Sequence, residues 1–172
     1  MRPDALKQKL REAALNYARK RSFPIGDSPA SAVIFSNLRD SFHPESFEAI
    51  AANGEWQART TKPHSKVAGV LEMQSSNSSD ALLMSIFCHP NIGDWKGVRD
   101  LLDDSLDQLH FGVKGEVHVN GGQADSTEID MSLTDTLCEA KLTEVDFCTK
   151  PCEVVEGYDG LQESVGNRDT WG

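Results

Sequence analysis

Two carboxylates and a lysine, Asp130, Glu139 and Lys141, fall close together in residues 126–144, a stretch typical of two short strands joined by a tight turn. The first arm alternates, with Ile129, Met131 and Leu133 on one side. Side chains two apart in a strand point the same way, so Glu139 and Lys141 share a face. If the arms pair around residues 134–136, Asp130 lies near Glu139. Such a face suits a divalent metal ion with a lysine beside it.

The same residues have a plainer interpretation. An exposed hairpin often carries ordinary Glu–Lys pairs, each of which contributes little to stability. Asp80 is either a further acid for the metal or a plain N-cap of the apolar segment that follows it. We expect Glu128 to face away from Asp130 and Glu144 to lie at the surface.

Length and composition favour a single soluble domain. The chain has 172 residues, of which 38% are hydrophobic and 26% charged, and it has no apolar run of the ~20 residues that a membrane helix requires. Its N-terminus is polar and basic, without the apolar region of a secretory signal, so the default location is the cytoplasm. The net charge of −10 counts against general DNA coating, although residues 1–24 carry seven basic and two acidic residues.

Helices are expected first and strands later. The 3.6-residue period predicts helices over residues 3–21, from about residue 43 to Asn53, after the serine-rich run before Ala81, and from Asp94 to about Leu109. We interpret that serine-rich run as a helix cap rather than a flexible linker. Residues 57–67 read as a polar, basic loop. Residues 111–119 and the two arms of the hairpin predict a three-stranded antiparallel meander, so the fold class is α+β.

Asp130 followed by Glu139-Ala140-Lys141 resembles the D…(D/E)-x-K signature of the PD-(D/E)XK nuclease superfamily, which has the restriction-endonuclease-like fold. The continuation through Leu142, Thr143 and Glu144 is similar to the E-x-K-x-T-E segment of one bacterial group of candidate restriction endonucleases. Phe147-Cys148, and Ser78-Ser79-Asp80-Ala81 before an apolar helix, also resemble that group. The superfamily's proline before the first aspartate is absent, because Ile129 stands there.

The resemblance implies a nuclease-like core over residues 75–172, with a central mixed sheet containing the meander and flanked by helices. Residues 1–74 would form an N-terminal extension of helices and loops within a single domain, 1–172. A further helix and strand are implied after the Lys141 strand, where the chain is glycine-rich and acidic. We therefore expect either short last elements or a C-terminally truncated core.

The implied activity is Mg²⁺-dependent hydrolysis of phosphodiester bonds in DNA, double-stranded above all, with Mn²⁺ as a substitute. Asp130, Glu139 and the backbone carbonyl of Ala140 would hold the metal, and Lys141 would orient or deprotonate the attacking water or neutralise the phosphate. Asp130, Glu139 and Lys141 are thus the predicted catalytic residues. Cutting both strands often uses two sites, which makes a homodimer compatible with this function.

Two other classes stay open. The acidic charge and the short tail favour a catalytically inactive nuclease-like module for binding or assembly. A small thiol–metal protein would use Cys138, Cys148, Cys152 and His118, although two cysteines four apart are a weak ligand spacing.

Overall fold

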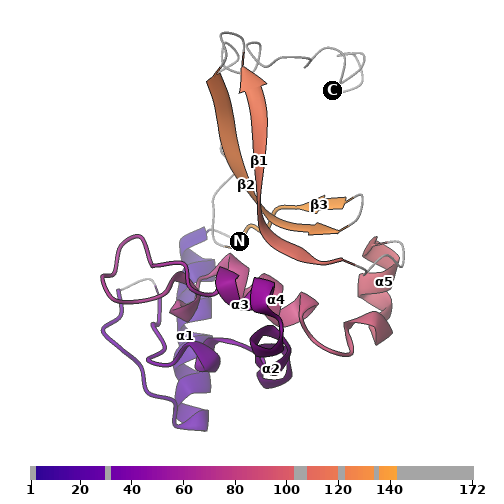
Figure 1. The fold of residues 1–172 in the computed structure, drawn as a ribbon. Helices are drawn as coiled ribbons and strands as arrows, with labels where there is room; N and C mark the ends of the chain where they lie inside the picture. The colour runs from indigo at the N-terminus through magenta and orange to yellow at the C-terminus, as the bar shows by residue number, and fades with distance from the viewer. Residues whose placement is uncertain (1–2, 30–31, 103–107, 120–122, 134–135, 143–172) are drawn as a thin grey trace.

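In the computed structural model, the described residues are 3–29, 32–102, 108–119, 123–133 and 136–142. The elements occur in the order α1 (Pro3–Arg21), η1 (Leu38–Ser41), α2 (Pro44–Ala52), α3 (Gly54–Arg59), η2 (Glu72–Gln74), α4 (Ser79–Phe87), η3 (Ile92–Asp94), α5 (Lys96–Leu102), β1 (His110–Val119), β2 (Gln123–Leu133) and β3 (Thr136–Cys138). The helices gather in one body, from which the long β1–β2 hairpin projects (Figure 1). The α+β fold class is confirmed.

The described sheet is an antiparallel meander in the order β1-β2-β3. Its register pairs Phe111 with Met131 and Met131 with Cys138. Met131 and Leu133 of β2 are 0% and 2% exposed, so the apolar parity of this strand faces the core, as its alternation predicts. Elements around the core contribute further buried side chains, namely Phe42, Ile50, Met73, Met84 and Phe87.

The predicted N-terminal helix and the capped helix are both confirmed. Pro3 and Asp4 begin α1, and Arg19, Lys20 and Arg21 occupy its last turn, where positive charge complements the helix dipole. Ser78 caps α4, because its side chain accepts a hydrogen bond of 3.1 Å from the Ala81 backbone N–H. The serine-rich run is therefore a cap rather than a linker.

Two helix boundaries differ from the prediction. Residues 54–59 form α3, because Asn53 caps this short helix by accepting from the N–H groups of Glu55 and Trp56. The helix predicted to continue to about Leu109 does not reach it. Gln108 has a φ of 60°, and the Trp56 indole donates to the Leu109 carbonyl at 3.0 Å. This anchor holds the chain in the extended entry to β1.

The E-x-K segment also departs from the expected structure, because β3 ends at Cys138 and Glu139, Ala140 and Lys141 follow it outside the strand. The Asp130 side chain explains why β3 ends early, since its carboxylate accepts a hydrogen bond from the Ala140 backbone N–H. The predicted division into an extension over 1–74 and a core over 75–172 stays a prediction. The Thr143–Glu144 motif, the two C-terminal cysteines and the predicted last elements lie outside the described residues.

Candidate active site

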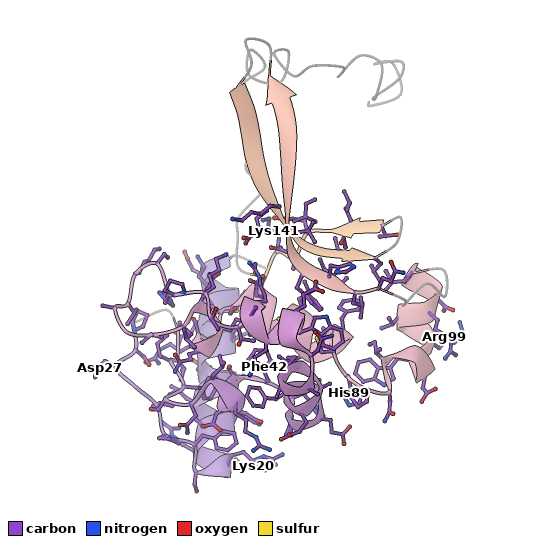
Figure 2. The ribbon with its side chains drawn as sticks, in the orientation of Figure 1. Lys20, Asp27, Phe42, His89, Arg99 and Lys141 are labelled. Carbon is purple, nitrogen blue, oxygen red and sulfur yellow. The ribbon has the colours of Figure 1, made fainter. Side chains whose placement is uncertain are left out.

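The three predicted catalytic residues come together at the base of the hairpin. Asp130 lies on β2, and the register that pairs Met131 with Cys138 brings Glu139 opposite it, one position beyond the last pair. The Ala140 backbone N–H donates to Asp130 Oδ2 at 2.8 Å. Lys141 Nζ forms an ion pair with Glu139 Oε1. In Figure 2 Lys141 lies where the projecting strands meet the helical body.

Asp80 is a further acid of this cluster. It lies in the first turn of α4, 5% exposed, and is not the N-cap, because Ser78 fills that role. Burial, only partly offset by Arg59, raises the pKa of Asp80, and the negative charge of Asp130 raises it further. Burial also raises the pKa of Asp130, with Glu139 adding to the shift and the Ala140 N–H opposing it. The acids are close enough to repel one another.

Arg59, the last residue of α3, holds this arrangement together, although no sequence motif points to it. Its Nη2 contacts Asp80 Oδ2 at 2.6 Å and its Nη1 contacts Glu128 Oε1 at 2.8 Å. The Arg59 side chain is only 9% exposed. Burial opposes its charge, but the two carboxylates outweigh that effect and raise its pKa. The buried guanidinium thus links α3, α4 and β2.

Because Gly112 has no side chain, the Arg59 guanidinium can pack directly against its backbone. It lies in β1 opposite Asp130, between the pairs at residues 111 and 113, with a φ of 65°. A Cβ atom on Gly112 would lie 2.5 Å from Arg59 Nη1. A glycine inside a strand pattern indicates a close approach of another group, and this signal could have located the contact.

The expectation that Glu128 faces away from Asp130 is wrong. Residues two apart in β2 lie on the same face, so Glu128 points towards the cluster with Asp130. Its carboxylate accepts from Arg59 and, at 3.0 Å, from Lys62. The pKa of Glu128 is lowered, because these two cations together outweigh the opposing effect of burial. Glu128 is therefore a half-buried carboxylate that pairs with two cations.

A basic hollow of about 620 Å³ adjoins the cluster. Its lining includes Lys7, Lys62, His64, Lys66 and Glu72, together with serine hydroxyls. Lys62 belongs to both features, because it pairs with Glu72 at 3.3 Å and with Glu128. Residues 57–67, predicted as a polar, basic loop, thus supply cations at the edge of the site.

The donor set suits a hard divalent cation. Asp130 and Glu139 offer carboxylate oxygens and Ala140 offers a peptide carbonyl, and Mg²⁺ prefers oxygen ligands of these kinds. No histidine or cysteine belongs to this set. Of the predicted thiol–metal ligands, Cys138 is a free thiol packed against the core. The other three have side chains outside the described part of the chain.

The model of one protein family matches residues 6–164, a range that covers nearly all of the chain and the whole site. The family is described as "Restriction Endonuclease associating with ARP". The chain belongs to this family. No curated protein and no solved structure matches the chain. None of the described helices is long and apolar enough to cross a membrane.

Proposed function

We propose that the protein is a metal-dependent nuclease of the PD-(D/E)XK type that hydrolyses phosphodiester bonds in DNA. The observation that carries this proposal is the meeting of Asp130, Glu139, Ala140 and Lys141 in a member of a restriction endonuclease family. Asp130 lies on β2 and Glu139 directly follows β3, and the β2–β3 register together with the hydrogen bond from the Ala140 N–H brings them together.

Each residue has a separate role in this mechanism. Asp130, Glu139 and the Ala140 carbonyl would hold Mg²⁺ or Mn²⁺, which would stabilise the negative charge that develops on the phosphate. Lys141, on its flexible stem, orients the attacking water or neutralises the phosphate, because it reaches the same face as Glu139. Asp80 places an additional negative charge behind Asp130, and Arg59 balances that charge.

DNA is the proposed substrate because of the family and the basic hollow. Lys7, Lys62 and Lys66 present positive charge next to the acidic cluster, in a protein whose net charge is −10. A duplex backbone in this hollow would pass the metal ligands. Cleavage of both strands would use two copies of the chain, so we also propose a homodimer on DNA. Association with ARP, which the family description names, is a further proposed interaction.

Cleavage of supercoiled plasmid DNA tests the catalytic set. We expect cleavage with Mg²⁺ or Mn²⁺ and none with EDTA. Asp130→Asn, Glu139→Gln and Lys141→Ala should each lower the rate at least about 100-fold, because each removes a metal ligand or the charge beside the phosphate.

Asp100→Asn, on the exposed face of α5, is the matched control and should cleave like the wild type. Undiminished cleavage by the Asp130 or Lys141 variant would contradict the catalytic assignment.

The second candidate is an inactive nuclease-like module that binds DNA or a partner protein. The ion pair between Lys141 and Glu139 favours it, since it engages the lysine and one metal ligand with each other. Calorimetry separates the two functions. A nuclease should bind Mn²⁺ at a site that is lost in Glu139→Gln, whereas an inactive module would show no Mn²⁺ binding that depends on Glu139.

A further inference from the structure

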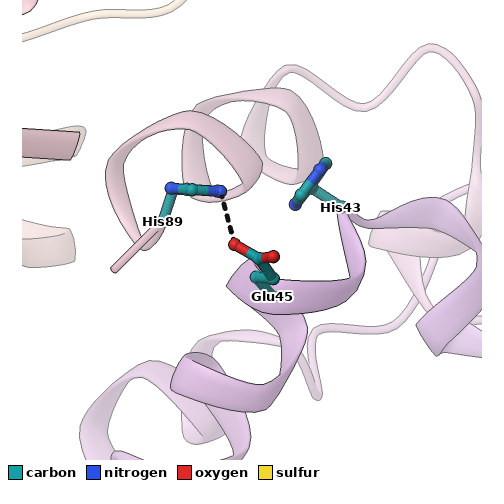
Figure 3. A group of neighbouring side chains, drawn as sticks. All are labelled: His43, Glu45 and His89. Carbon is teal, nitrogen blue, oxygen red and sulfur yellow. Dashed lines mark ion pairs between the residues drawn. The ribbon is translucent and has the colours of Figure 1, made fainter. Parts of the chain in front are cut away.

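A second group of metal-binding side chains lies on the helical body. His43 is the N-cap of α2, Glu45 lies in the first turn of that helix, and His89 follows the C-terminal end of α4. One ligand atom from each of the three side chains lies within 4.8 Å of the other two. Glu45 Oε2 and His89 Nε2 are 3.0 Å apart, and Figure 3 shows the three side chains converging.

The surroundings hold this group in place. His89 is 9% exposed, and its ring contacts the rings of His43 and Trp95, with centroid distances of 5.0 Å to each. Two contacts fasten α2 to α4 beside the group: the Ser46 hydroxyl donates to the Ser85 carbonyl at 2.6 Å, and the His43 N–H donates to the Ser85 hydroxyl at 3.3 Å. The three ligands therefore come from two helices whose separation is already fixed.

We propose that His43, Glu45 and His89 bind a transition-metal cation, with Zn²⁺ as the natural occupant. Two imidazoles and one carboxylate are a ligand set that suits zinc and its neighbours, whereas Mg²⁺ takes oxygen ligands. With bonds of about 2.0–2.2 Å to each ligand, the group has to contract modestly. The exposed side chains of His43 and Glu45 can do so by rotation, while His89 stays in place. A fourth position faces solvent and takes water.

Binding requires a defined change at His89. The Asn91 backbone N–H donates to His89 Nδ1 at 3.1 Å, so the neutral ring carries its proton on Nε2 and donates it to Glu45. The cation takes the Nε2 position, and the ring proton moves to Nδ1. The Asn91 N–H then loses its acceptor. The turn after α4 must rearrange locally, which gives the binding event a signature at a residue outside the ligand set.

The role of this cation is structural. His89 and Asp80 lie at opposite ends of α4, a helix of nine residues, about 13 Å of axial rise apart. A cation on His43, Glu45 and His89 therefore does not reach the Asp130 cluster. It joins the start of α2 to the end of α4, and it stabilises the folded state by the free energy of binding.

Calorimetric titration of the full chain with Zn²⁺ tests the proposal. The buffer contains enough Mg²⁺ to occupy the proposed site at Asp130 and Glu139. We expect one equivalent to bind with a rise in Tm. Glu45→Gln and His89→Gln should each weaken binding at least tenfold. Co²⁺ in place of Zn²⁺ should give a visible spectrum without thiolate charge-transfer bands. The Asn91 amide resonance should shift on Zn²⁺ addition.

Two variants serve as matched controls. Glu48→Gln alters a neighbouring carboxylate of α2, and His110→Gln alters a histidine in a simple His–Glu pair with Glu55. Both should bind Zn²⁺ like the wild type. Absence of Zn²⁺ binding, an equal loss in the controls, or undiminished binding by Glu45→Gln would overturn the proposal. Because Glu45 is exposed, its variant gives an answer even if His89→Gln fails to fold.

Discussion

Asp130 combines two requirements that conflict in the metal-free protein. Its carboxylate must be ionised to hold a cation, yet burial and the neighbouring acids raise its pKa. The folded protein therefore binds a proton at Asp130 more tightly than the unfolded chain does. The resulting stabilisation is complete below the ordinary pKa of an aspartate and is lost as the pH rises through the raised value. At neutral pH the ionised carboxylate destabilises the fold.

Asp130→Asn should therefore stabilise the metal-free protein at pH 7. The asparagine carbonyl can still accept from the Ala140 N–H, but the repelled charge is gone. We expect a higher Tm in EDTA at pH 7, and a difference from the wild type that shrinks as the pH falls through the raised pKa of Asp130 and is smallest below about 3.9. Thermal unfolding followed by circular dichroism across this range checks the prediction. Asp100→Asn should show no such pH-dependent gain, and a lower Tm for Asp130→Asn at pH 7 would contradict it.

The site residues differ in how far the sequence predicts them. The juxtaposition of Asp130 and Glu139 follows from the two-residue period of a strand and the short turn. Arg59 has no such local signal, because its partners, Asp80 and Glu128, lie on α4 and β2. Only the tertiary packing shows that this arginine is buried between them. Pairwise proximity along a hairpin is predictable, whereas charge neutralisation across elements is not.

At the scale of elements, α4 connects the two proposed cation sites. Its start carries Asp80, and His89 follows its end. The Ser78 hydroxyl satisfies the Ala81 N–H at the first turn, and the Ala81 and Met84 side chains pack in the core. The cap and the apolar period of this helix were both readable in the sequence. Where β3 ends was not, since alternation shows which residues share a face but not how far pairing continues.

Ser78→Ala should destabilise the protein by about 1 kcal/mol, because an alanine leaves the Ala81 N–H without its cap. We expect a correspondingly lower midpoint in urea unfolding, with an unchanged m-value. Ser65→Ala, in an exposed loop, should stay within about 0.5 kcal/mol of the wild type. Equal stability of the Ser78 variant and the wild type would show that the hydroxyl does not cap α4.

At the scale of the whole molecule, a positively charged surface region occurs in a protein whose net charge is negative. The chain carries −10 overall, yet the hollow beside the acidic cluster presents Lys7, Lys62 and Lys66. Long-range repulsion of a polyanion must therefore be overcome by local contacts. The net charge counts against general DNA coating, but it does not show where on the molecule the charges lie. The hollow combines α1 with a loop distant in sequence, which only the fold brings together.

DNA binding through this hollow should depend on salt. With Ca²⁺ replacing Mg²⁺ to prevent cleavage, the logarithm of the duplex affinity should fall linearly with the logarithm of the salt concentration. Lys66→Gln should weaken binding and reduce the slope by about 1. Lys96→Gln, on the exposed part of α5, should change neither quantity. Fluorescence anisotropy with a labelled duplex gives both values, and an unchanged slope for Lys66→Gln would exclude it from the contact surface.

The bond from Ala140 to Asp130 has a consequence for how the motif is recognised. Position 140 contributes a main-chain N–H to Asp130 and, in the proposed mechanism, a main-chain carbonyl to the cation. Neither group depends on the identity of the side chain, so nineteen residue types could serve at this position. Proline is the exception, because it has no N–H to donate. The site therefore places no requirement on the side chain at the middle position of the E-x-K signature, although the backbone of that residue connects Asp130 with the segment that carries Glu139 and Lys141.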